Sequence, residues 1–161
     1  MECLKSEQAG RYGKLAKRAK KQRIPRQKSD QKIRSVWVKN TLALWGKIIV
    51  ARDGECQWCF GKKCNNYKLG GHHIVARSIT KQQLAAWFDE RNGMALGWWC
   101  HDNIKHDPDE YIIIRDIFLK MHGLKYDHLK TILTIKGSFS LSDIQVVYGQ
   151  FERECIKQKL I

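Results

Sequence analysis

The spacing of apolar residues predicts helices on both sides of a central segment whose pattern is different. Between about Ile33 and Arg52, apolar side chains recur at the spacing of one helix face, and Asp53-Gly54 ends the run. The apolar positions of this stretch are Val36, Trp37, Leu42, Leu44, Trp45, Ile48 and Ile49. We expect this helix to support the segment that follows it.

The central segment combines glycines, short apolar runs and polar loops. Residues 68–76 (KLGGHHIVA) predict a short strand, residues 93–97 predict a second strand, and residues 98–105 predict a helix. A loop is expected between the strands, with a helical turn at 82–88. The order strand, loop, strand, helix, set between longer helices, predicts the α+β class.

The helical pattern returns after the central segment. Helices are expected at about 107–121 and at 126–133. Ser142 and Gln145 have the spacing of a capping box, which predicts a last helix that ends near Leu160. An apolar fraction of 43% is enough for a packed core.

Positive charge is concentrated near the N-terminus. The formal net charge is +14, and thirteen of the thirty Lys and Arg residues fall within residues 1–40, against three acids. A clustered basic arm is typical of proteins that bind the phosphate backbone, and the arm lacks the bulky apolar face of a membrane-surface helix. The residues expected to contact DNA are Lys14, Lys17, Arg18, Lys20, Lys21, Arg23 and Arg26. The alternative is a solvated tail that only aids solubility.

Three regions follow from these patterns. They are a basic, flexible DNA-binding arm (1–34), a central domain with its flanking helices (35–134) and a C-terminal helical extension (135–161). No apolar run reaches the length of a membrane span, and the first residues contain no apolar signal segment. A cytoplasmic protein that does not bind membrane is therefore expected.

Cysteine and histidine gather in the central region. Four of the six cysteines and four of the six histidines lie between residues 56 and 106. Because disulfides are rare in the cytoplasm, this clustering indicates metal binding. His72 and His73 on a strand point to opposite faces, so one can bind a metal while the other faces a substrate. A divalent ion beside a neutral imidazole makes a workable phosphodiesterase site, since the imidazole takes a proton from water.

Two motifs in this region together resemble the HNH (ββα-metal) endonucleases. Residues 72–76 (HHIVA) resemble the first half of the HNH motif, and residues 92–101 (NGMALGWWCH) resemble the second half. The resemblance covers about residues 53–106 and implies a small ββα-metal core with helices on either side.

The resemblance assigns a role to each matching residue. It implies that His73 is the base, that His72 and His101 bind catalytic Mg²⁺ or Mn²⁺, and that Asn92 braces the loop and orients the base. The implied catalytic set is therefore His73, Asn92 and His101. The expected reaction is hydrolysis of a DNA phosphodiester bond.

Flanking residues extend the resemblance to bacteriophage proteins. Residues 44–54, which lead into Cys56-x-x-Cys59, resemble the helix before the metal knuckle of phage HNH proteins. Residues 87–92 (WFDERN) resemble the phage recombination nucleases of the Rap/NinG type, and residues 106–110 resemble the exit of the HNH helix. This finer similarity implies branched recombination DNA as substrate and the bacterial host cytoplasm as location.

The cysteines match the zinc knuckle of that family with one departure. Many HNH proteins bind a structural Zn²⁺ through two C-x-x-C pairs. Cys56 and Cys59 supply the first pair and Cys100 the last member, but Gly97 stands where its partner is expected. We expect Cys64 to replace the missing ligand. The alternative is that zinc is absent and the cysteines are small buried apolar residues.

A second departure concerns the third ligand of the catalytic metal. The position four residues after His101 is Lys105, which cannot ligate as a cation. His106 is the substitute we expect, unless water completes the shell, as is normal for Mg²⁺.

Tryptophans near the knuckle are expected to be structural. Trp58, Trp98 and Trp99 flank the cysteines and are predicted to pack the small core, with stacking on bases as the less favoured interpretation.

Two other functions remain alternatives to the nuclease. One is a zinc-dependent DNA-binding module without catalysis, and the other is a phage scaffold protein that keeps a nuclease fold. The paired histidines, Asn92 and His101 favour the nuclease, because a purely structural knuckle does not need them. Strand preference, RNA cleavage and dimerisation stay open at this stage.

Overall fold

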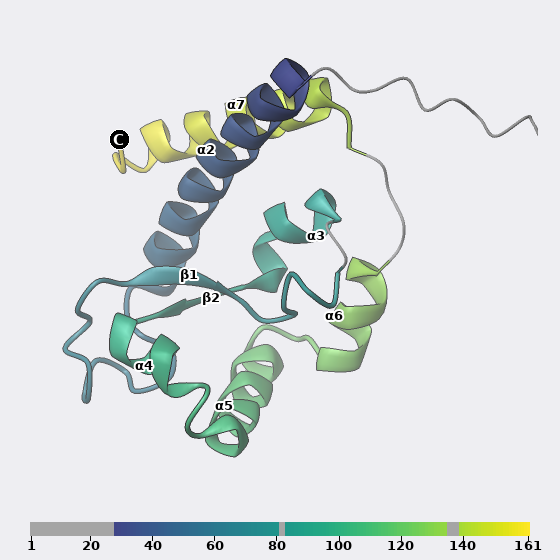
Figure 1. Cartoon of the computed structure of the whole chain (residues 1–161). Coiled ribbons are helices and arrows are strands. Elements are labelled where there is room, and N and C mark those ends of the chain that lie inside the picture. Colours follow the sequence, from purple (N-terminus) through teal and green to yellow (C-terminus); the bar gives the residue numbers. More distant parts are fainter. Residues whose placement is uncertain (1–27, 81–82, 135–138) are drawn as a thin grey trace, which may run out of the picture. The chain divides into compact units, whose positions relative to one another are not determined.

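The regular secondary structure of the described residues consists of helices and one pair of short strands, which confirms the α+β class (Figure 1). The computed structural model describes residues 28–80, 83–134 and 139–161. The chain divides into two units, Met1–Lys32 and Ile33–Ile161. Among the described residues, no helix has both the length and the apolar character needed to cross a bilayer.

The central order strand, loop, strand, helix is confirmed. The elements are α2 (Lys28–Asp53), β1 (Gly70–His73), α3 (Leu84–Phe88), the 3-10 helix η1 (Glu90–Asn92), β2 (Gly93–Leu96), α4 (Trp98–Asn103), α5 (Pro108–Met121), α6 (Tyr126–Leu133) and α7 (Leu141–Lys157). Helix α2 begins before Ile33, so residues 28–34 of the predicted arm are helical. Apolar periodicity missed this start, because its Lys, Gln and Arg residues favour helix without showing a buried face.

Strands β1 and β2 form an antiparallel pair whose two faces have different neighbours. The register pairs Gly71 with Ala95 and His73 with Gly93. A Cβ atom on Gly93 would lie 2.4 Å from Ile49 Cδ1, and one on Gly71 would lie 2.8 Å from the Trp45 ring. These glycines therefore let α2 lie directly on this face of the sheet.

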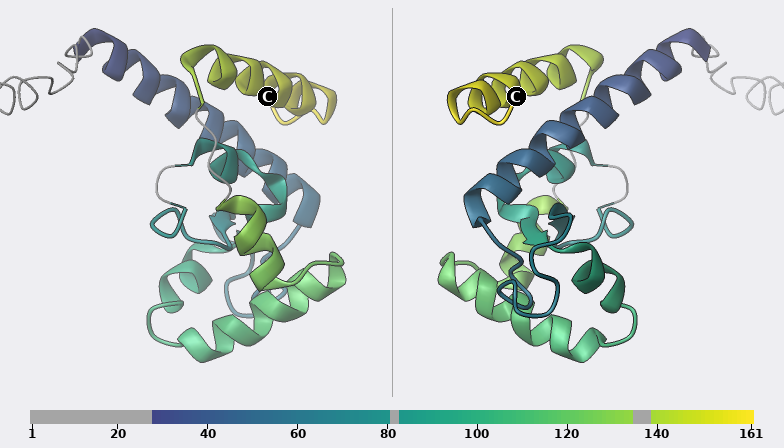
Figure 2. Two further views of the ribbon diagram at one scale, coloured as in Figure 1. Left: turned by 90° about the vertical axis from the view of Figure 1, so that its right-hand side faces the viewer. Right: turned by 90° about the vertical axis from the view of Figure 1, so that its left-hand side faces the viewer.

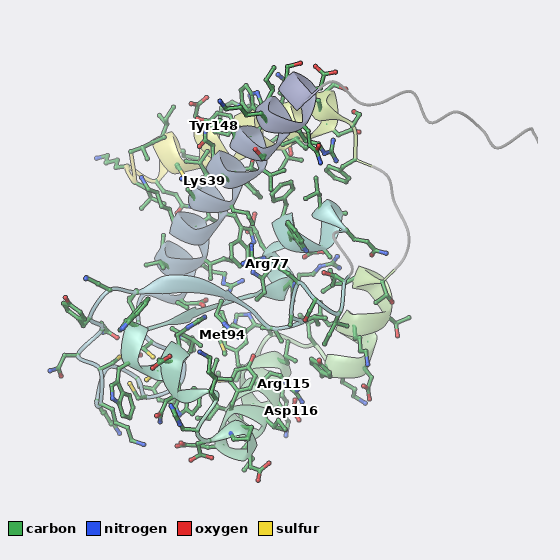
Figure 3. The ribbon with its side chains drawn as sticks, in the orientation of Figure 1. Lys39, Arg77, Met94, Arg115, Asp116 and Tyr148 are labelled. Atoms are coloured by element: carbon green, nitrogen blue, oxygen red, sulfur yellow. The ribbon has the colours of Figure 1, made fainter. Side chains whose placement is uncertain are left out.

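The opposite face of the sheet contacts the later helices. His72 pairs with Met94 in the ladder, so their side chains share this face. Met94 is fully buried and packs in the same cluster as Phe118 and Leu119 of α5. Figure 3 shows Met94 between the sheet and α5. The two histidines of β1 thus face different helices.

Two apolar clusters correspond to the two faces. The buried members of the α2-side cluster are Leu44, Trp45, Ile48, Ile49, Leu84, Phe88, Ala95, Ile144, Phe151 and Cys155. The other cluster joins the cysteines, Met94 and Leu96 to buried residues of α5 and α6. Three residues of the first cluster come from α7, which lies beside α2 in Figures 1 and 2. The predicted C-terminal extension therefore contributes to the core that supports β1 and β2.

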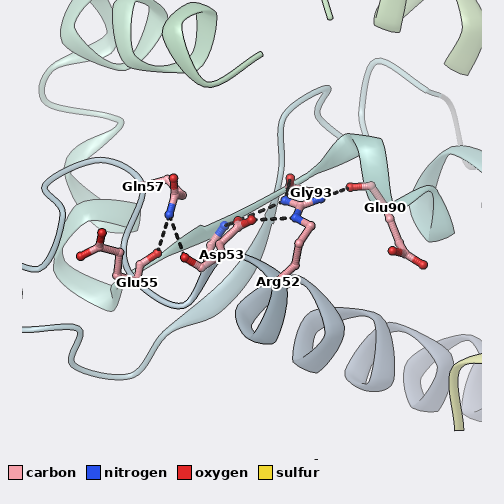
Figure 4. Close-up of polar contacts among 7 residues, drawn as sticks. Arg52, Asp53, Glu55, Gln57, Glu90 and Gly93 are labelled. Atoms are coloured by element: carbon pink, nitrogen blue, oxygen red, sulfur yellow. Dashed lines mark hydrogen bonds and ion pairs between the residues drawn. The ribbon is translucent and has the colours of Figure 1, made fainter. Parts of the chain in front are cut away.

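The C-terminal end of α2 is attached to the sheet by polar contacts (Figure 4). Arg52 donates hydrogen bonds to the carbonyl oxygens of Glu90, at 2.8 Å, and Gly93, at 2.7 Å. Asp53 accepts a bond from the Ala95 amide at 2.7 Å and forms an ion pair with Arg52. Gln57 donates to the Asp53 carbonyl at 3.2 Å. The pair Arg52-Asp53 therefore fixes the start of β2 against the end of the helix.

Two sequence expectations about packing and capping are wrong. Trp98 and Trp99 are 65% and 49% exposed, because Cys100 is the residue of the short helix α4 that turns inward. The capping box of α7 is formed by Ser140 and Asp143 rather than by Ser142 and Gln145. Both serine pairs have the required spacing, and the chain enters the helix at the earlier one.

Candidate functional site

The four predicted cysteine ligands lie together as a closed group. The sulfur atoms of Cys56, Cys59, Cys64 and Cys100 all lie within 4.8 Å of one another, and all four residues are buried. A tetrahedral zinc with Zn–S bonds of about 2.3 Å places its sulfurs about 3.8 Å apart. The group is therefore compatible with a structural zinc site.

Local backbone turns bring these cysteines together. The Phe60 amide donates to the Cys56 carbonyl at 2.7 Å, which closes the turn of the C-x-x-C pair. The Asn66 side chain accepts a bond from the Cys56 amide at 2.9 Å, and the Gln57 amide donates to the Ala95 carbonyl at 2.9 Å. Hydrogen bonds thus connect the Cys56–Cys59 turn both to the loop that follows it and to β2.

Cys64 occupies the space that a side chain at position 97 would need. A Cβ atom built on Gly97 would lie 2.5 Å from the Cys64 sulfur. Gly97 has φ −69° and ψ 151°, a conformation open to any residue. Glycine is therefore needed here for space rather than for backbone conformation. The Cys64 sulfur fills the space beside residue 97 and completes the group of four cysteines.

The thiols of the cluster have shifted pKa values. Burial raises the pKa of Cys64 to about 11, and the Cys59 thiol adds to this shift. Burial also raises the pKa of Cys100. Burial acts in the same direction on Cys59, but hydrogen bonds from the amides of Lys63 and Cys64 and from the Cys64 and Cys100 side chains together outweigh it and lower the pKa to about 7. Amide donors aimed at a cysteine sulfur favour the thiolate form that metals bind.

His72 and His101 meet on the α4–α5 side of the sheet. Their rings lie edge to face with centroids 5.1 Å apart. His72 Nε2 lies 3.1 Å from the hydroxyl of Tyr111 on α5. Burial lowers the pKa of His72 to about 3, helped by His101 and His73, so its ring is neutral and able to ligate. His101 is exposed to solvent.

His73 lies on the other face and is held in one orientation. Its ring stacks on Trp45, with centroids 4.3 Å apart and an interplanar angle of 11°. Its Nε2 lies 3.0 Å from the Trp87 carbonyl oxygen. Because a carbonyl only accepts, this contact places the proton on Nε2 and leaves Nδ1 as the proton acceptor. Burial lowers the pKa of His73 and keeps the ring neutral at pH 7.

Asn92 is fully buried and bridges the loop between the strands. Its Oδ1 accepts a bond from the Val75 amide at 2.7 Å. Its Nδ2 donates to the Ala86 carbonyl at 3.0 Å and to the Val75 carbonyl at 3.3 Å. Since Trp87 follows Ala86, this amide holds the backbone next to the carbonyl that contacts His73.

The third ligand expected for a catalytic metal is not beside the first two. In residues 28–80, 83–134 and 139–161, the four cysteines are the one group of three or more potential ligands within range of a single ion. His106 follows α4, is exposed, and does not complete such a group with His72 and His101. Lys105 is directed to Asp102, with which it forms a 3.7 Å ion pair. A metal at the histidines would therefore have open positions for water.

The predicted DNA contacts of the arm, from Lys14 to Arg26, lie outside the described residues. Of the basic residues nearer the site, Arg77 lies over the Trp87 ring at 5.4 Å, and Arg91 forms a 2.6 Å ion pair with Asp89. These two side chains have partners within the chain, so neither is simply a solvated charge.

Two contacts at the histidines could not be found from the sequence pattern. Tyr111 and Trp45 lie in different helices, far from β1 along the chain, and both occupy positions that a helical apolar face explains by itself. Their polar and stacking roles depend on tertiary packing.

The chain matches no family model, no curated protein and no solved structure.

Proposed function

We propose that the chain is a metal-dependent DNA endonuclease of the HNH type, which hydrolyses phosphodiester bonds with water activated by His73. One observation carries the proposal: the adjacent His72 and His73 lie on opposite faces of β1, each with different partners. His72 lies against His101, whereas His73 stacks on Trp45. A metal ligand and a general base can therefore be neighbours without competing for one ion.

His72 and His101 are the residues that would hold the divalent ion, Mg²⁺ or Mn²⁺. When bound, the ion supplies stabilisation of the negative charge that develops on the phosphate. Ring centroids 5.1 Å apart allow both imidazoles to present a nitrogen to one ion. The Tyr111 hydroxyl contacts His72 Nε2, which leaves Nδ1 of this ring for ligation.

His73 would take the proton from water at Nδ1. The Trp87 carbonyl holds the Nε2 proton, and the Trp45 ring fixes the plane of the imidazole. The ring therefore cannot turn without losing a contact. Asn92 supports the same geometry, because its side chain donates a hydrogen bond to the carbonyl of Ala86, the residue before Trp87. A general base held in position in this way typically raises the rate of the catalysed reaction by about 10²–10⁴-fold.

We also propose that the four cysteines bind a structural Zn²⁺. A closed tetrahedral site of this kind adds directly to folding stability. The substitution Gly97→Ala is expected to displace Cys64, since the new Cβ would lie 2.5 Å from its sulfur. Zinc affinity, measured by competition with a chelator, should fall in this variant.

Gly70→Ala is the matched control, because an added Cβ there would meet nothing within 4 Å. Equal zinc affinity in the two variants would show that Cys64 is not a ligand.

The test of the nuclease uses a supercoiled plasmid and a four-way DNA junction. Zinc-loaded protein is incubated with each DNA in Mg²⁺, in Mn²⁺ and without an added divalent ion. We expect metal-dependent cleavage by the wild type that is lost in His73→Ala and kept in His128→Ala, an exposed histidine of α6. Preference for the junction would support a role on branched recombination intermediates.

A protein that binds both DNAs and cuts neither in any metal would overturn the proposal. The zinc-dependent DNA-binding module would then be the better account. Cleavage that persists unchanged in His73→Ala would instead reject His73 as the base.

A further inference from the structure

Four exposed aromatic residues lie close to the clustered cysteines along the chain. Phe60, Tyr67, Trp98 and Trp99 are 49%, 61%, 65% and 49% exposed. Among the described residues, these four are the aromatic members of the set of exposed large apolar side chains, and the remaining members are aliphatic or methionine. We call these four residues the aromatic rim.

The aromatic rim is built on a small and well-connected centre. Phe60 directly follows Cys59, and Trp99 directly precedes Cys100. The Trp98 amide donates to the Tyr67 carbonyl at 3.2 Å, which joins α4 to the knuckle loop. Each rim residue lies within three positions of a cysteine whose sulfur belongs to the cluster, so the four residues belong to segments that meet at one centre.

Positive charge accompanies the aromatic rim. Residues 56–71 contain three lysines and no acid. Lys62 and Lys68 are exposed, and the Lys68 ammonium lies 5.1 Å from the centre of the Tyr67 ring. Lys63 is partly neutralised by Glu110, at 3.7 Å. The rim thus combines flat apolar surfaces with cations that suit a polyanion.

This combination fits unpaired nucleotides better than the alternatives. Aromatic rings stack on exposed bases of any sequence, and nearby cations follow the phosphate backbone. A base in an intact duplex has no free face to offer, whereas a base at a branch or in a single strand does. A surface for a protein partner would not need lysines between its aromatic residues.

We propose that the aromatic rim binds unpaired bases of a nucleic acid by stacking, with Lys62 and Lys68 facing the phosphates. This site is separate from the histidines and does not depend on cleavage. If the proposed nuclease activity holds, the rim also indicates the substrate class of the nuclease, because Trp98 and Trp99 lie on the same helix, α4, as His101. A substrate with unpaired bases would then be held beside the cleavage site.

The test measures equilibrium binding of the full chain, zinc-loaded and without Mg²⁺ or Mn²⁺, to a labelled oligothymidine and to a blunt duplex of equal length. Trp98→Ala and Trp99→Ala are each expected to weaken oligothymidine binding by about five- to a hundredfold, and duplex binding by less than about twofold. The salt dependence should stay unchanged, because no phosphate contact is removed. Trp98→Phe should restore most of the lost affinity.

Ile113→Ala is the matched control, since Ile113 on α5 is 60% exposed and lies outside the rim. Zinc content is measured in each variant, and Phe60→Ala provides a variant outside α4 in case substitutions beside Cys100 disturb the metal. Unchanged oligothymidine binding in zinc-loaded Trp98→Ala, Trp99→Ala and Phe60→Ala would overturn the proposal and leave a protein partner as the better occupant. An equal loss for duplex and single strand would also overturn it. Because no cleavage is measured, either result leaves the nuclease test unaffected.

Discussion

The cysteine cluster and the pair formed by His72 and His101 are neighbouring sites that differ in burial and in the number of potential ligands. All four cysteines are buried, and their sulfurs form a complete group within 4.8 Å. The histidine site has two close imidazoles, one of which is exposed, and no third ligand among the described residues. Cys100 and His101 are adjacent on α4, yet one turns into the core and the other faces solvent. A single turn of α4 therefore contributes one residue to each site.

This difference fits the two separate roles that we propose for the sites. A zinc ion held by all four cysteines would have no position left for a substrate, so the cysteine cluster suits a structural role. An open site with imidazole ligands and room for water is the arrangement that metal-assisted hydrolysis needs. Changes at the cysteines should consequently alter folding, and changes at the histidines should alter activity with the fold intact.

The largest effect is expected for Cys100→Ser. Loss of one ligand opens the closed site, and structural zinc in small domains contributes on the order of 10 kcal/mol. We expect loss of bound zinc, measured by atomic emission, together with loss of the cooperative thermal transition. Cys155→Ser, at a buried cysteine packed on the α2 side, should keep its zinc. Equal zinc loss in both variants would mean that the cluster does not bind the metal.

The next effect is expected for His101→Ala. Removal of an exposed ligand should lower the cleavage rate by roughly a hundredfold or more, because several kcal/mol of metal stabilisation are lost. Zinc content and thermal stability should remain at wild-type values. His106→Ala is the matched comparison, and its rate should change by less than about threefold, because His106 does not join the pair. The reverse ranking would show that His106 is the ligand.

A smaller effect, on stability and activity together, is expected for Asn92→Ala. The change leaves the Val75 amide and the Ala86 carbonyl without their buried partner, at a cost of about 2–3 kcal/mol. Denaturant unfolding measures this loss. Asn40→Ala, at an exposed position of α2, should leave the unfolding free energy within about 0.5 kcal/mol of wild type. A loss at Asn92 no greater than at Asn40 would contradict the bracing role.

The smallest effect is expected for Tyr111→Phe. Deleting the hydroxyl removes the contact that orients His72, and such supporting contacts are worth about tenfold in metal affinity. The concentration of Mn²⁺ that gives half-maximal cleavage should rise by about that factor. Tyr126→Phe keeps its ring contact with Arg115 and should not shift this concentration. A fall in the required Mn²⁺ would mean that Tyr111 competes with the metal for His72.

Local pattern predicted the order of the central elements and several of the helices. The short strand that contains His72 and His73 and the helix at 126–133 depend on neighbours in sequence, so local pattern was sufficient for them. The four cysteines were expected from the resemblance to a zinc knuckle, and the fold brings Cys100 to the other three from a distant part of the chain. Cys64 was predicted by exclusion from the absence of cysteine at 97, and the steric relation between Cys64 and Gly97 supports that choice.

Other features depend on contacts between distant segments. The stacking of Trp45 on His73 and the bond from Tyr111 to His72 join helices to a strand across the fold. The exposure of Trp98 and Trp99 depends on which residue of a short helix turns inward, and here the cysteine cluster draws in Cys100. Periodicity over so few residues does not decide this orientation.

The most direct test of two sites with separate roles measures zinc content and plasmid cleavage on the same samples. Zinc-loaded wild-type protein is assayed without added divalent ion, after addition of Mg²⁺ or Mn²⁺, and again after dialysis of that ion. We predict that cleavage appears and disappears with the added ion while zinc stays stoichiometric. Cleavage that needs no added ion and declines in step with zinc would contradict the account, because the cysteine-bound metal would then be required for the reaction itself.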